Sequence, residues 1–209
     1  MGRSSGDAWG AGLKERIRAN AALVIGQFSP LADFDFGFNA RSVAWVDGFI
    51  ENQRQRPDRD HHTEESLIDI LGSFLGECII SCFGGQWEQR EDQWCIHFGS
   101  RNALYPFHKV RKRFANGPQD SIETFFSLIP LTFPEYVQLE WHIRQAEAAY
   151  ARLYEARSDS ERAAAYSDCK EGMADALHLA RKLGLEERAV KLERKLAHYK
   201  AVFRHQMDL

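Results

Sequence analysis

The sequence predicts an α+β protein that is mostly α-helical, with a small antiparallel sheet beside a central buried helix and an antiparallel helical unit at the C-terminus. Residues 67–83 are apolar around most of a helix circumference, which is typical of a helix packed on several sides. Residues 86–98 alternate large apolar side chains with polar ones, which favours a β-hairpin. Beyond residue 134 the chain has few Gly and no further Pro, and its apolar residues step by three and four, which favours long helices.

Composition indicates an ordinary globular protein. The 209 residues are 44% hydrophobic and 12% aromatic, which argues against general disorder. A shift in composition divides the chain into an α+β domain with N-terminal helices over residues 1–131 and a three-helix extension over residues 132–209. The formal net charge of −3 at pH 7 argues against a protein that binds polyanions with its whole surface.

Two helices are expected before the central one. The first covers residues 13–28 and ends at Pro30. The second is capped by Asn39 or Ser42 and reaches Ile50. A polar, charged loop then leads to the central helix.

The central helix carries two glycines four residues apart. We expect Thr63 to cap its start, because the acidic residues that follow suit the positive end of a helix, and Gly84 to end it. Gly72 and Gly76 each cost about 1 kcal/mol of helix propensity relative to Ala. Because these two glycines share one face, we expect the inner face of the sheet to cover both of them closely.

The sheet and the helices that follow it come next along the chain. The predicted hairpin turns at Glu91 and Asp92, and a third short strand lies within residues 103–107. The next segment is typical of a short basic helix that closes at Gly117. A further short helix is expected to end at Pro130.

Three apolar seams predict three helices in the extension. The seams cover residues 136–153, 166–183 and 185–203, with Gly184 as the turn between the last two. We expect these helices to form an antiparallel unit that serves for docking or dimerisation. Trp141 lies off its seam and is therefore a candidate for contact with the rest of the chain, a second chain or a ligand.

Three motifs together resemble an uncharacterised bacterial domain family. They are Leu75-Gly76-Glu77, the sequence GGQW at residues 84–87 and the sequence YPFHKVRKRFANG at residues 105–117. The resemblance covers about residues 39–131 and implies a helix, a GG-x-W turn, a short sheet and a PF-x-K-V segment. It implies no activity, although related small domains are suspected in toxin immunity and other partner-binding settings.

Glu77 lies in the most apolar part of the central helix. A carboxylate in such surroundings needs a partner or a shifted pKa. Lys109 is the first candidate for that partner and Arg101 the second, so we expect a structural buried ion pair.

No assembled catalytic or metal-binding motif occurs in the sequence. The four Cys form no C-x-x-C pair, and two of them lie in the apolar helix, which indicates buried reduced thiols. The His residues do not show H-E-x-x-H spacing, and Walker, dinucleotide and nucleophile-elbow motifs are missing. We therefore expect no catalytic residue, no metal site and no cofactor.

Residues 108–113 form the most basic segment of the chain. Arg111, Lys112 and Arg113 are candidates for binding phosphate groups or an acidic partner. The alternative is a solvated helix face on which one or two of these side chains pair inward.

These observations favour a non-catalytic bacterial protein-interaction module, with immunity-like or adaptor-like roles as more specific hypotheses. An enzyme with a site near Glu77 and the hairpin is one alternative, and nucleic-acid binding through residues 108–113 is a second. We expect an unknown protein partner or a homodimer rather than nucleic acid. Residues 1–12 contain no apolar signal region, and Asp69 and Glu77 interrupt the central apolar run, so we expect a cytoplasmic protein without a membrane span.

Overall fold

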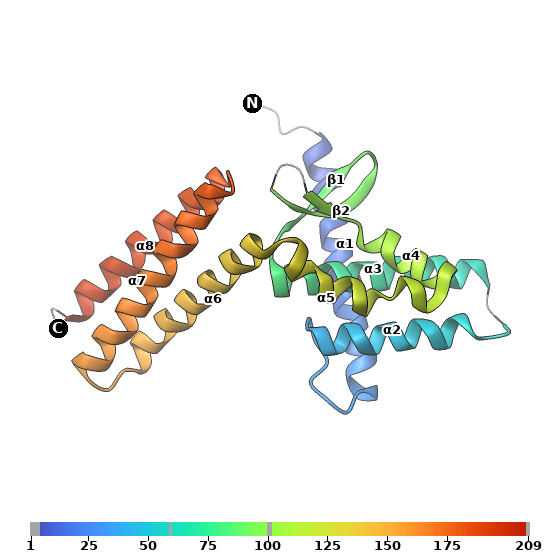
Figure 1. Cartoon of the computed structure of the whole chain (residues 1–209), viewed down its shortest axis with the longest axis horizontal. Helices are drawn as coiled ribbons and strands as arrows, with labels where there is room; N and C mark the ends of the chain where they lie inside the picture. Colours follow the sequence, from blue (N-terminus) through green and yellow to red (C-terminus); the bar gives the residue numbers. More distant parts are fainter. Residues whose placement is uncertain (1–4, 59, 100–101, 208–209) are drawn as a thin grey trace. The chain divides into compact units, whose positions relative to one another are not determined.

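The computed structural model describes residues 5–58, 60–99 and 102–207 and confirms the predicted α+β class, mostly helical with one small sheet (Figure 1). The chain divides into two compact units, Met1–Thr132 and Phe133–Leu209, which we call unit 1 and unit 2. Unit 1 contains α1 (Ser5–Phe28), η1 (Ser29–Leu31), α2 (Ala40–Arg54), α3 (His61–Phe83), β1 (Gln86–Arg90), β2 (Gln93–Phe98), β3 (Asn102–Leu104), α4 (Pro106–Asn116), η2 (Gly117–Asp120) and α5 (Ile122–Thr132). Unit 2 contains α6 (Pro134–Glu155), α7 (Asp159–Lys182) and α8 (Glu186–Met207).

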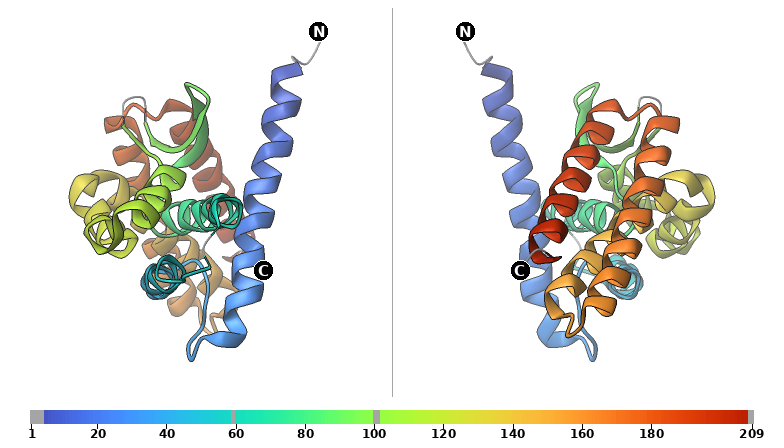
Figure 2. Two further views of the ribbon diagram at one scale, coloured as in Figure 1. Left: turned by 90° about the vertical axis from the view of Figure 1, so that its right-hand side faces the viewer. Right: turned by 90° about the vertical axis from the view of Figure 1, so that its left-hand side faces the viewer.

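Helix α3 is the centre of unit 1. Its side chains at Ile68, Leu71, Phe74, Leu75 and Ile79 are fully buried. Figures 1 and 2 show α1 crossing α3, and the two helices are in contact. The buried residues of α1 recur every three or four positions, so one face of that helix lies against the core.

The ends of several helices differ from the sequence prediction, and α1 begins at Ser5 rather than at residue 13. Asp60, not Thr63, is the N-cap of α3, because its carboxylate accepts a 2.9 Å hydrogen bond from the backbone N–H of Thr63. Gly84 ends α3 as expected, with a φ of 81°. Pro130 does not end α5, which continues to Thr132, because a proline near the end of a helix removes only one backbone hydrogen bond.

Close packing explains the two glycines of α3. A Cβ atom added to Gly76 would overlap the ring of Trp87, and one added to Gly72 would lie 2.9 Å from the Cα atom of Phe107. Trp87 belongs to β1, but Phe107 belongs to the first turn of α4. The sheet therefore covers Gly76 only, and the expectation that it covers both glycines is wrong for Gly72.

The sheet is a three-stranded antiparallel meander in the order β1-β2-β3. Its first turn is at Glu91 and Asp92, as predicted, and both residues have positive φ angles, of 46° and 62°. This is the geometry of a two-residue turn that matches the twist of the flanking strands. The third strand is shorter than predicted, because Pro106 starts α4 two residues after Leu104.

Unit 2 is a three-helix assembly with a core of small residues. Helices α6 and α7 approach closely, since a Cβ atom added to Gly172 would lie 3.3 Å from the Cβ atom of Ala146. Gly184, with a φ of 69°, joins α7 to α8, and the N–H of Leu185 donates a 2.9 Å hydrogen bond to the carbonyl of Ala180. This is the helix stop that the sequence predicted.

By length and composition alone, α3 is the one helix among the described residues that could cross a membrane. The expectation that its apolar run is too short and too polar does not hold for the whole helix, which extends over 23 residues. Half of its most apolar window is buried inside the protein. Core helices and membrane spans share this composition.

Substitution by alanine should have opposite effects on stability at Gly76, which contacts Trp87, and at Gly48, which has open space around it. Gly76→Ala should lower the free energy of unfolding by about 1–3 kcal/mol, because the new methyl group would overlap the Trp87 ring. Gly48→Ala in α2 should raise it by about 0.5–1 kcal/mol, because no atom lies within 4 Å of the new methyl group. Urea unfolding of both variants measures the two changes, and equal effects would contradict the close contact.

Candidate functional site

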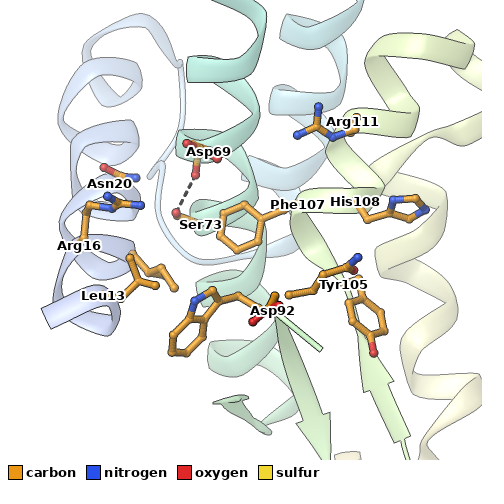
Figure 3. Close-up of a pocket in the computed structure, with 13 residues that line it drawn as sticks. Leu13, Arg16, Asn20, Asp69, Ser73, Asp92, Tyr105, Phe107, His108 and Arg111 are labelled. Carbon is orange, nitrogen blue, oxygen red and sulfur yellow. Dashed lines mark hydrogen bonds between the residues drawn. The ribbon is translucent and has the colours of Figure 1, made fainter. Parts of the chain in front are cut away.

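A cavity of about 330 Å³ lies in unit 1 between α1, α3, the β1–β2 turn and the start of α4 (Figure 3). Elements that are far apart in the sequence therefore contribute to one site. Its lining combines an apolar floor with a polar rim. We call this site the unit 1 cavity.

The apolar floor consists of Leu13 and Ile17 from α1, Trp94 from β2 and Phe107 from α4. The ring centroid of Phe107 lies 5.6 Å from that of Trp87, and the ring of Trp94 meets Trp87 edge-on at 6.5 Å. The floor is therefore held in place by core packing. The indole N–H of Trp94 is buried and donates to no atom of the described residues. This group therefore lacks the hydrogen bond that buried polar groups normally form.

The polar rim comes from three elements. Arg16 and Asn20 lie one turn apart on α1 and face Asp69 and Ser73 of α3 in Figure 3. The Ser73 hydroxyl donates a 2.7 Å hydrogen bond to the backbone carbonyl of Asp69. In the part of the chain that the structure describes, the side chains of Arg16, Asn20 and Asp92 form no hydrogen bond or ion pair. These groups are available to a ligand.

Arg111 also lines the cavity, but its charge is already engaged. Both terminal nitrogens of its guanidinium donate to the two carboxylate oxygens of Glu65, one of them at 2.8 Å. The same hydrogen bonds lower the pKa of the Glu65 carboxyl below its usual value. A bidentate pair of this kind fixes the orientation of the guanidinium and pairs its charge with a carboxylate.

The rest of the basic segment does not form a free cationic surface. Lys109 donates a 2.8 Å hydrogen bond to Asp120. Arg113 is 2% exposed and is therefore not a surface binding residue, which corrects the sequence interpretation. Lys112 is exposed. His108 is also exposed, and it is one of the residues that line the cavity.

Arg113 joins three helices through two carboxylates that the sequence analysis missed. Its Nε and Nη2 atoms both donate to Asp47 at 3.1 Å, and its Nη1 atom donates to Glu51 at 2.6 Å. Asp47 also accepts a 2.6 Å hydrogen bond from the backbone N–H of Ile122 at the start of α5. The four-residue spacing of Asp47 and Glu51 places both carboxylates on one face of α2, and this pattern could have indicated that they share a cation.

Glu77 has a different partner from the one expected. Its Oε1 atom accepts a 2.8 Å hydrogen bond from the indole N–H of Trp87. Lys109 pairs with Asp120 instead, and Arg101 lies outside the described residues. The reason is local, because the ring that packs on Gly76 brings its N–H to the next residue of α3.

Thiols and metal ligands are not assembled into a site. Among residues 5–58, 60–99 and 102–207, no group of three His, Cys, Asp or Glu is placed to hold a metal ion. None of the four Cys, all of them described residues, forms a disulfide. Burial raises the pKa of Cys78 and Cys95, and raises the pKa of Cys169 to about 11, so these thiols stay protonated near neutral pH.

Trp141 is 57% exposed on α6. Its ring meets the neighbouring ring of His142 edge-on, with centroids 4.9 Å apart. The helix core at Leu139 and Ile143 is buried, so Trp141 lies off the seam as the sequence indicated.

Comparison with known proteins adds no constraint. No protein-family model, no curated protein and no solved structure matches this chain. The resemblance drawn from the LGE, GGQW and PFHKV segments therefore stays an expectation. Function must be argued from the geometry of the unit 1 cavity and its surroundings.

The buried guanidinium of Arg113 predicts that substitutions at two neighbouring residues of α4 have very different effects on stability. Arg113→Met should lower the free energy of unfolding by about 3–5 kcal/mol, because it removes the buried guanidinium that the carboxylates of Asp47 and Glu51 share. Lys112→Met, on the exposed side of the same helix, should change it by less than about 0.5 kcal/mol. Chemical denaturation at neutral pH distinguishes them. Similar losses in both variants would argue against the buried network.

The same network predicts a pH dependence. Hydrogen bonds from Arg54 and Arg113 lower the pKa of Glu51 from 4.5 to about 2. A lowered pKa in the folded state stabilises the protein above pH 4.5, and this contribution is lost as the pH falls toward 2.

The stability advantage of the wild type over Glu51→Gln should therefore be full above pH 4.5 and shrink toward pH 2. Urea unfolding across this range measures it. Glu15→Gln, an exposed change on α1, is the control and should change the stability by less than about 0.5 kcal/mol. A constant gap for Glu51→Gln would contradict the assignment.

Proposed function

We propose that this chain is a non-catalytic protein-interaction module and that the unit 1 cavity holds a side chain of the partner polypeptide. The observation that carries the proposal is the combination of a fixed aromatic floor with rim groups that the fold does not use. Binding sites typically place a few polar groups around an apolar pocket. The immunity-like and adaptor-like bacterial roles expected from the sequence belong to this class.

The size of the cavity supports a side chain as its occupant. At about 330 Å³ it lies at the lower end of the range of about 300–1,000 Å³ for ligand pockets. Large cofactors need more room, whereas a single anchor residue of a partner does not. Anchors of this kind carry much of the binding energy at protein interfaces.

The two alternatives have less support. An enzyme site at Glu77 needs an available carboxylate, but Trp87 already donates to it. Nucleic-acid binding needs several free cations, but Lys109, Arg111 and Arg113 are paired with carboxylates. A homodimer through exposed Trp141 is retained as a second contact within the same proposal.

A selection from a random peptide library against the full chain tests the proposal. Peptides that bind the wild type should bind at least about tenfold more weakly to Asn20→Trp, because the new ring fills the mouth of the cavity. Ala19→Trp is the matched control, because Ala19 is exposed on the same helix and does not line the cavity.

Circular dichroism should show equal helix content in both variants. Peptides that bind both variants equally would show that the partner binds elsewhere. If no peptide is enriched over background, the proposed recognition of polypeptides is wrong.

A further inference from the structure

The charges around the unit 1 cavity are not balanced. Asp69 and Asp92 contribute two carboxylates, and Arg16 and Arg111 contribute two guanidinium groups. Because Glu65 binds both terminal nitrogens of Arg111, Arg16 is the guanidinium without a carboxylate partner among the described lining residues, which also contribute the carboxylates of Asp69 and Asp92. A ligand of positive charge fits this excess better than an anion does.

Asp92 and Asp69 differ in their charged surroundings. Arg111 acts electrostatically on Asp69, whereas no described cation pairs with Asp92. Figure 3 shows Asp69 above Phe107 and Asp92 below it, and all three residues line the cavity.

The aromatic floor also suits a cation. The ammonium group of Lys14, which is not one of the lining residues, lies 6.0 Å from the centroid of the Trp94 ring. An ammonium or guanidinium group within about 6 Å of a Trp ring is attracted by the charge distribution of the ring. The stem of a long basic side chain also packs well on apolar surface.

We propose that the unit 1 cavity binds a Lys or Arg side chain of the partner polypeptide, with its stem on Phe107 and Trp94 and its charged group at Asp92. This inference rests on the proposed function and names the residue class that the cavity recognises. A metal ion is a poor alternative, because the described residues offer no group of three ligands. An anion would be repelled by both carboxylates, and Arg111 would already be bound to Glu65.

Nuclear magnetic resonance of the ¹⁵N-labelled full chain tests the inference with three small probes. Butylammonium and butylguanidinium should shift the indole N–H signal of Trp94 in a saturable way, and butyrate should not. The signal is assigned with Trp94→Phe. Added NaCl should weaken binding of both cations, because the cavity is open to solvent.

Two neighbouring substitutions provide the matched comparison. Asp92→Asn should weaken binding of both cations about tenfold, because it removes the charge and keeps a residue that tolerates the positive φ of 62°. Glu91→Gln removes a charge from the same turn but not from the cavity lining, and should bind as the wild type does. Tight butyrate binding, or wild-type affinity in Asp92→Asn, would overturn the inference.

The peptide selection separates this inference from the proposed function. Selected peptides that Asn20→Trp blocks should contain Lys or Arg, and changing that residue to Gln should abolish binding. If blocked peptides need no basic residue, the proposed function stands and the inference is wrong. If the butyl cations bind but no peptide does, the cavity is a site for free cations, and both proposals are wrong.

Discussion

The contact of two aromatic rings with the backbone of α3 positions the hairpin and the start of α4, which form two walls of the unit 1 cavity. Gly72 and Gly76 lack the side chains that would hold Phe107 and Trp87 away. Trp87 thereby fixes the hairpin that carries Trp94 and the turn, and Phe107 fixes the first turn of α4. The cost in helix propensity, about 1 kcal/mol for each glycine, is offset by the burial of two large rings.

A second constraint is electrostatic and acts on another face of α4. The guanidinium of Arg113 connects α4 to α2 through Asp47 and Glu51, and Asp47 also holds the first N–H of α5. Burying a charge is unfavourable unless its hydrogen bonds are satisfied, and here four donor–acceptor contacts satisfy this guanidinium. Helix α4 is thus held by ring packing on one face and by charge on another.

Local patterns predicted the elements of this fold better than they predicted its contacts. The turn at Glu91 and Asp92, the close packing at Gly76 and the helix stop at Gly184 all follow from short-range rules. The partners of Lys109 and Arg113 do not, because tertiary distance decides which carboxylate each cation meets. The cavity itself was not predictable, since its walls come from α1, α3, the hairpin and α4, and no local signal brings these together.

The β1–β2 turn has a consequence for the engineering of this protein. Glu91 and Asp92 both adopt left-handed backbone conformations, which the sequence Asn-Gly adopts at a lower energetic cost. An Asn-Gly turn would therefore favour thermostability, but it would remove the carboxylate that faces the cavity. At this turn, robustness and recognition select different residues, and a variant library ranked by melting temperature alone would discard the charge that we assign to ligand binding.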